Sequence, residues 1–159
     1  MANYLALSAR IIKELQEIEQ VVERAEDIWR QSEASGDDRY LDGVALNLQS
    51  FYTGLERILE LVVSEIDEDR LAGPNWHQEL LRRAATEVPG LRPAILSDTT
   101  RNALDRYRGF RHVVRNVYSF DLDKEEMAPL LRDLRPVFAN AKTDLTRFAT
   151  ALAQTDKDN

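Results

Sequence analysis

The residues best suited to chemistry gather in one short stretch, residues 106–120, which contains four Arg and one His but no acid. Guanidinium groups bind phosphate oxygens in pairs and stabilise the negative charge of a phosphoryl transition state. A histidine moves protons near neutral pH, here from a ribose 2′-hydroxyl or to a leaving 5′-oxygen. Because no acidic cluster accompanies them, these residues favour a metal-independent cut of RNA. The candidates are Arg108, Arg111, His112, Arg115 and Asn116.

These residues also have a plainer interpretation. An Arg-rich helix face is commonly solvated, or is paired with acids on a neighbouring helix. The chain carries a net charge of −7, which argues against a protein that coats nucleic acid generally. The basic stretch is therefore either a placed site for an anion or a helix that pairs with acidic neighbours.

Composition excludes several other classes of chemistry. The chain has no Cys, so disulfides, thiolate metal sites and thiol nucleophiles are absent. Its other histidine, His77, has no acidic or thiol neighbours that would complete a metal site, and we interpret it as structural. We expect no metal and no cofactor. With no apolar run of about 20 residues and an early charged N-terminus, we expect a cytoplasmic protein without a membrane span.

The first half of the chain predicts two long helices. Apolar residues recur at steps of three and four over 11–29 and again over 41–62, where a wider stripe predicts the most buried helix. Gly36 ends the first helix, and Asp37 or Asp38 caps the second. Joined by a short polar turn, the two form an antiparallel hairpin.

The second half predicts one short helix and two long ones. The short helix covers 76–88 and is followed by a loop over 89–93; Ser97 or Asp98 then caps a helix that runs to about Tyr118. Val113, Val114 and Val117 fall on its core face by helical geometry, and the candidate residues fall on its polar face. Within that polar face, Arg108, His112 and Asn116 stand four residues apart in one row.

The last helix begins with a capping-box pattern at Asp123 and Glu126, and Pro129 and Pro136 should kink or split it. The final six residues are expected to fray. The whole predicts an all-α antiparallel bundle of four long helices plus one short helix, a single domain over residues 1–159 with an ordered core at about 4–153.

The stretch Arg111–Tyr118, with the sequence RHVVRNVY, resembles the R-x4-H-x-Y signature of HEPN-domain ribonucleases, in particular the HepT-like toxins. Tyr107 and Phe110 before it, and FDLD after it, are similar to the family's flanking context. Two weaker similarities lie elsewhere, in residues 51–57 (FYTGLER) and in Trp76-His77. The resemblance covers most of the chain in helix order, but its specificity lies in residues 107–123.

The resemblance implies a helical bundle that forms a homodimer, with the motif helices of both subunits around a shared cleft. It implies RNA cleavage without metal, with Arg111 binding phosphate and Arg108 and Arg115 as further RNA contacts. It also implies a partner, a minimal nucleotidyltransferase antitoxin that adds AMP to the motif tyrosine, here Tyr118.

The chain departs from the signature at one position, because Asn116 stands where the family has its catalytic His. Three explanations stay open. His112, one helical turn earlier, takes over proton transfer while Asn116 orients it or the phosphate; or the site is naturally weakened; or Asn116 is an introduced substitution. Two non-enzymatic alternatives also stand: a HEPN-fold binding subunit that has lost catalysis, and a plain helical scaffold.

Overall fold

The structure, a computed structural model, describes residues 3–158. Within them the chain forms five α-helices and no strand, which confirms the all-α class. The helices are α1 (Tyr4–Ser35), α2 (Tyr40–Val62), α3 (Trp76–Ala84), α4 (Asp98–Arg115) and α5 (Lys124–Asp158). A π-helical turn, η1 (Val63–Asp67), continues α2, and a 3-10 turn, η2 (Ser119–Asp121), follows α4.

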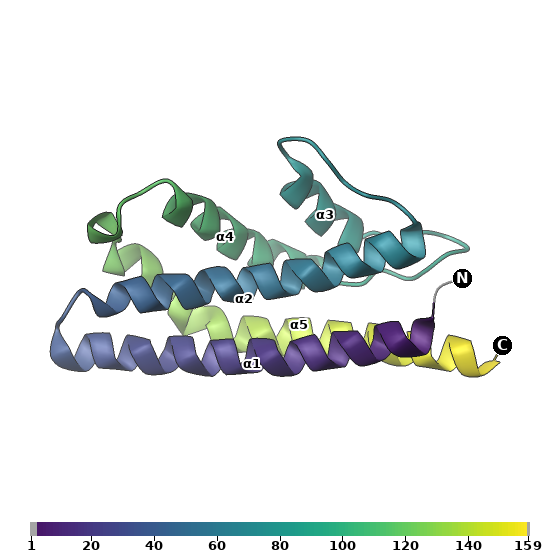
Figure 1. Ribbon diagram of the computed structural model, residues 1–159, viewed down its shortest axis with the longest axis horizontal. Coiled ribbons are helices and arrows are strands. Elements are labelled where there is room, and N and C mark those ends of the chain that lie inside the picture. The colour runs from purple at the N-terminus through teal and green to yellow at the C-terminus, as the bar shows by residue number, and fades with distance from the viewer. Residues whose placement is uncertain (1–2, 159) are drawn as a thin grey trace.

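Helix α2 occupies the centre of the bundle (Figure 1). It runs antiparallel to α1, contacts α3 and α4 on its other side, and continues into η1, while α5 lies along α1. Apolar side chains are buried on several faces of α2, among them Leu48, Phe51, Leu55 and Ile58. The predicted antiparallel hairpin, with the second helix the more buried, is confirmed.

The ends of α1 show why it is so long. Asn3 caps it by accepting from the backbone N–H of Ala6 at 3.0 Å, and Gly36 ends it in the left-handed conformation, with φ 68°. Near the N-terminus, the backbone N–H of Leu5 donates to Asp156 at 2.8 Å. Residues 154–158 are helical, so the prediction that they fray is wrong, and Asn159 lies outside the described residues.

Of two further predicted caps, the one for α2 is wrong, whereas Asp123 caps α5 without the reciprocal bond of a capping box. Neither Asp37 nor Asp38 caps α2, because the Asp37 carboxylate instead accepts from the backbone N–H and the guanidinium of Arg39. At the start of α5, Asp123 accepts from the N–H of Glu125 at 2.9 Å. Glu126 makes no reciprocal bond within the described residues.

Helix α3 ends at Ala84, four residues before the predicted end, because the chain turns back on itself at Val88–Arg92. The Arg92 guanidinium fills the turn. It is buried, bonds Asp67 of η1 at 2.6 and 2.9 Å and donates to backbone carbonyls of the loop. The loop predicted over 89–93 is confirmed.

Helix α4 begins as predicted at the Ser97 cap, but it ends at Arg115 rather than near Tyr118. Val113 and Val117, predicted to face the core, are 42% and 40% exposed, so that prediction is wrong for both. The α4 residues that pack inward, Leu104, Tyr107 and Phe110, all lie nearer the start of the helix.

Helix α5 is unbroken through Pro129 and Pro136, so the prediction of a split is wrong. Each proline removes only one backbone donor. Leu130, Leu134 and Val137 are buried beside the two prolines, and their packing holds the helix in place.

Close packing of α1 on α2 generates a test at Gly54. A Cβ at this position would lie 2.8 Å from Cγ1 of Ile18, which is buried. Gly54→Ala should therefore lower the free energy of unfolding by roughly 1–3 kcal/mol, as overpacked cores do.

Gly109 of α4 is the matched control, since a Cβ there meets nothing within 4 Å. Gly109→Ala should raise the free energy of unfolding by about 1 kcal/mol through helix propensity. Urea denaturation measures both. Equal effects of the two substitutions would contradict this account of the α1–α2 contact.

Candidate functional site

Arg111 is the centre of the site, and it is buried. Its Nη1 lies 3.1 Å from Oε1 of Glu56 and 3.3 Å from the hydroxyl of Thr53, both on α2. The side chains of Arg111 and Glu56 are only 9% and 5% exposed. The motif arginine was predicted on the polar face of its helix; it instead forms a buried ion pair that joins α4 to α2.

His77 completes the cluster, although the sequence analysis interpreted it as structural. Its Nδ1 lies 2.7 Å from Oε2 of Glu56, so one carboxylate serves both His77 and Arg111. Nη2 of Arg111 lies 3.1 Å from Nδ1 and 3.3 Å from Nε2 of the same ring. The imidazole is 27% exposed, so part of it stays open to solvent.

Tyr52 lies under the cluster. Its ring centroid is 5.2 Å from the guanidinium carbon of Arg111, within cation–π range. Burial, with Glu56 nearby, raises the pKa of the Tyr52 phenol far above its ordinary value. Tyr52 is thus a neutral support for the guanidinium and not a proton donor at neutral pH.

Glu60 lies one helical turn after Glu56. Burial, with the Glu56 carboxylate as the next cause, raises the pKa of Glu60 above its ordinary value. A raised pKa means that ionised Glu60 is disfavoured in the fold, so its contribution to stability falls as the pH rises above about 4.5. The ionised carboxylate of Glu60 is therefore less stable in the fold than it is in water.

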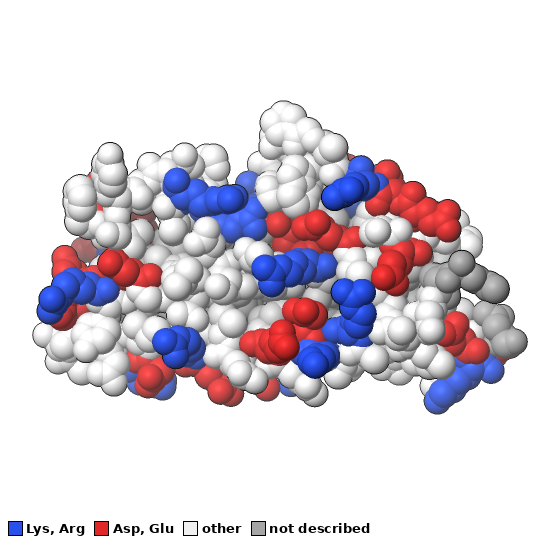
Figure 2. Space-filling model, viewed as in Figure 1, with Lys and Arg blue, Asp and Glu red and all other residues white. Residues whose placement is uncertain are grey.

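Two grooves open beside the cluster. The larger, of about 650 Å³, lies between α2, α3 and α4; the smaller, of about 330 Å³, lies between α3 and α4. His77, Arg111 and Arg115 line both. Figure 2 shows basic side chains gathered over α4, acidic ones over α2 beneath α3, and a hollow between α4 and α3.

The structure brings four of the predicted site residues to the smaller groove: Arg108, Arg111, His112 and Arg115. Arg108 also pairs with Asp105 at 2.7 Å. Arg115 has no carboxylate within 4 Å among the described residues, which leaves its charge available for an anion.

Asn116 and Tyr118 lie outside the grooves. Asn116 is the residue that ends α4, and its side-chain amide donates to the backbone carbonyl of His112 at 2.7 Å. Tyr118 lies beyond the helix, is 73% exposed, and stacks on Phe120 with ring centroids 5.4 Å apart.

Sequence reasoning missed Thr53, Glu56 and His77 as parts of the site. The signal was present, because the segments FYTGLER and Trp76-His77 were the two weaker similarities to the HEPN family. Periodicity explains these residues equally well as ordinary parts of amphipathic helices. Only their contacts with Arg111 in the structure distinguish these three residues from the other polar residues of their helices.

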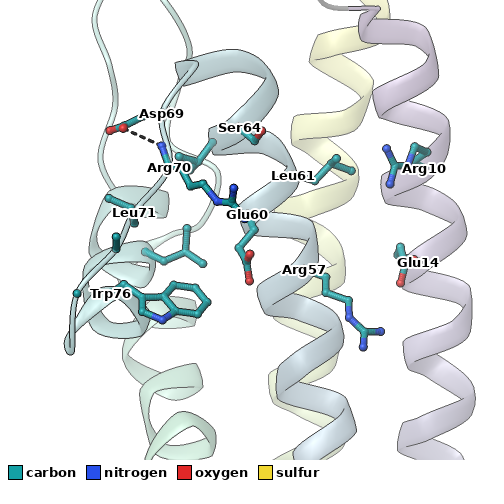
Figure 3. Close-up of a pocket in the computed structure, with 14 residues that line it drawn as sticks. Arg10, Glu14, Arg57, Glu60, Leu61, Ser64, Asp69, Arg70, Leu71 and Trp76 are labelled. Atoms are coloured by element: carbon teal, nitrogen blue, oxygen red, sulfur yellow. Dashed lines mark hydrogen bonds between the residues drawn. The ribbon is translucent and has the colours of Figure 1, made fainter.

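A third cavity, of about 920 Å³, continues the larger groove toward α1 and the loop before α3. Arg57, Glu60 and Trp76 line both spaces. In Figure 3 the Trp76 ring and the Arg70 side chain border this cavity on the side away from α1. The three spaces thus adjoin one another on the α2–α3 face.

The fold and site define an all-α protein with a buried Arg–Glu–His cluster that opens onto a partly basic groove. The family model of the HepT-like proteins matches residues 43–152, most of the chain from α2 into α5. The chain therefore belongs to the HepT-like protein family, which confirms the resemblance drawn from the motif. Comparisons with curated proteins and with solved structures found no match.

Two further findings concern the described residues alone. None of their helices combines the length and the apolar character needed to span a membrane. No group of three or more His, Asp or Glu side chains gathers among residues 3–158 as a metal site would require.

The shared carboxylate generates a stability test. Arg111→Met leaves Glu56 as a buried charge with one partner fewer, and should lower the free energy of unfolding by about 3–5 kcal/mol. Adding Glu56→Gln removes the stranded charge and should recover much of that loss. Urea denaturation of the two single variants and the double variant gives the coupling energy. Simple additivity would show that the ion pair does not hold α2 to α4.

Proposed function

We propose that this protein is a cytoplasmic HepT-like toxin, a metal-independent endoribonuclease that cleaves RNA through its own 2′-hydroxyl. The observation that carries the proposal is the state of Arg111. A guanidinium has five N–H donors, and the acceptors around Arg111 are Thr53, Glu56 and His77. Two donors remain without an acceptor among the described residues, and the side chain borders both grooves.

The proposed roles follow from position. Arg111 binds the phosphate of the bond to be cut, and Arg108 and Arg115 bind neighbouring phosphates along α4. His112 is exposed at the smaller groove and moves a proton at the reacting ribose or the leaving oxygen. Asn116 positions His112, because its amide bonds the His112 carbonyl and secures the last turn of α4.

The three adjoining cavities suit a single strand of RNA that passes from one to the next. From the Arg111 cluster it passes Trp76, which offers an aromatic ring for a base, and reaches Arg57 and Arg70. Six arginines line these cavities in a chain of net charge −7, and they offer RNA a local group of cations on this face: Arg10, Arg57, Arg70, Arg108, Arg111 and Arg115.

A homodimer is part of the proposal. Val113 and Val117 are exposed apolar side chains at the end of α4, and Leu46 of α2 is 62% exposed beside the larger groove. A second copy that covers these residues would remove apolar surface from water. It would also bring two motif helices to one cleft.

The proposed partner is a minimal nucleotidyltransferase antitoxin that adds AMP to Tyr118. The exposure of Tyr118 beyond the helix supports this step, since an enzyme can reach its hydroxyl. A bulky anion attached there stands near the end of α4, where it repels RNA phosphates.

One observation favours a second candidate function, a HEPN-fold binding subunit without catalysis. The Asn116 amide occupies the motif His position and is committed to the backbone at the helix end. An amide does not titrate, so this position contributes no proton transfer.

Cleavage of tRNA and total RNA in EDTA tests the proposal. The native chain should cut, and His112→Ala should lower the rate by about 10²–10⁴, the usual contribution of one general acid or base. The comparison includes Asn116→His. Cleavage by that variant alone would identify the native chain as a disabled nuclease. No cleavage by any of the three would favour the binding subunit.

The antitoxin step has its own test. Incubation with ATP and the nucleotidyltransferase should add one AMP to the native chain, and Tyr118→Phe should abolish the addition. Tyr40→Phe is the matched control, because Tyr40 is also exposed but lies outside the motif. Intact-mass spectrometry reads the result, and AMP addition that survives in Tyr118→Phe would place the modification elsewhere.

A further inference from the structure

Cleavage of RNA through the 2′-hydroxyl needs two proton transfers, one from the attacking oxygen and one to the leaving oxygen. Within one subunit the motif contributes one imidazole, His112. We propose that His77 is the second catalytic residue of this site, the base that takes the 2′-hydroxyl proton, and that Glu56 is its positioning residue. This inference rests on the proposed function and concerns a residue on α3, outside the motif.

The contact with Glu56 selects the state of the His77 ring. Nδ1 lies 2.7 Å from Oε2 of a carboxylate that is only 5% exposed. A neutral imidazole held this way keeps its proton on Nδ1 and leaves Nε2 as the acceptor. The same carboxylate compensates the imidazolium that forms when Nε2 takes a proton, as the third group of a catalytic triad does.

The neighbours of the ring hold it in place. The Trp76 ring packs on it, with centroids 3.7 Å apart, and Nη2 of Arg111 lies 3.3 Å from Nε2. An RNA phosphate that accepts the hydrogen bond from Nη2 of Arg111 would leave Nε2 of His77 free to accept a proton. Substrate binding and base activation would then be one event.

The position of His77 suits the reaction. It lines both grooves together with Arg111, so a phosphate on Arg111 lies beside the ring, and His112 lines the smaller groove as well. In the reaction Nε2 of His77 takes the 2′-hydroxyl proton, the O2′–P bond forms and the P–O5′ bond breaks. His112 gives a proton to the 5′-oxygen. The products are a 2′,3′-cyclic phosphate and a 5′-hydroxyl, and solvent restores both imidazoles.

The pH dependence of cleavage separates the two histidines. Charged groups face or lie near His77 from α2 and α4: Glu56, Glu60, Arg108, Arg111 and Arg115. Carboxylates and guanidinium groups keep their charge near pH 7 in an ordinary protein. Burial raises the pKa of Glu60 above its ordinary value. With a base and an acid at work, kcat/KM should rise and then fall with pH.

The experiment follows cleavage of a fluorogenic RNA oligonucleotide of mixed sequence in EDTA between pH 5 and 9. His77→Ala should lower the rate by about 10²–10⁴ and remove the rise at low pH. Added imidazole should restore part of the rate. Anisotropy should show RNA binding within a few-fold of the native chain, which a collapsed fold would not give.

Glu56→Gln tests the positioning role without removing the imidazole. It should lower the rate by about 10-fold, as does loss of a carboxylate that hydrogen-bonds a metal-binding histidine. The rise in rate should move to lower pH, because the carboxylate no longer stabilises the imidazolium. Glu79→Gln is the matched control on the solvent side of α3, where Glu79 pairs with Arg82, and its rate should equal that of the native chain.

The outcomes distinguish the inference from the proposed function. If the native chain cuts and His77→Ala retains the native rate and pH profile, His77 is structural and the inference is wrong while the proposed function stands. The inference is also wrong if His77→Ala lowers the rate, added imidazole does not restore it, and the pH profile of cleavage stays unchanged. If the native chain cuts no RNA, the proposed function fails first, and the inference fails with it.

Discussion

The arrangement of this protein depends on the contact of the Arg111 guanidinium with the Glu56 carboxylate, away from water, between α4 and α2. Two charges removed from solvent are tolerated only where hydrogen bonds satisfy the groups around them. Thr53 bonds the guanidinium, His77 bonds the carboxylate, and the Tyr52 ring lies within cation–π range. This requirement sets where α4 crosses α2, and it brings α3 close enough for His77 to reach. Arg111 also lines both grooves.

The end of α4 divides the motif into an inner and an outer part. Up to Arg111 the helix packs against α2 and α5, with Tyr107 bonded to the carbonyl of Leu130 at 2.7 Å. From His112 onward its side chains are mostly exposed, and the helix ends at Arg115. One short stretch thus joins a buried charge inside the fold to side chains that are exposed at its surface. A polar site at the edge of a core can be both rigid and accessible.

Local signals predicted most of the fold. The spacing of apolar residues at steps of three and four located the helices. Ser97 correctly marked the start of α4, and Gly36 the end of α1. These signals succeed because caps and periodicity act within one or two helical turns. The predictions that failed depend on distant groups. Helix α3 ends early around Arg92, which bonds Asp67 twenty-five residues away, and α5 continues through two prolines because buried neighbours pack on both sides.

The residues themselves specify a set of helices, an arginine and histidine motif, and membership of a family, since each of these is read over short distances along the chain. They do not reveal which polar residue is buried or what it contacts. Arg111 meets Glu56 across 55 positions and His77 across 34, and His77 meets Glu56 across 21. A periodic pattern of apolar residues carries no information about contacts between residues so far apart in the sequence. The packing of three helices around one carboxylate makes His77 part of the site and places Asn116 outside the grooves.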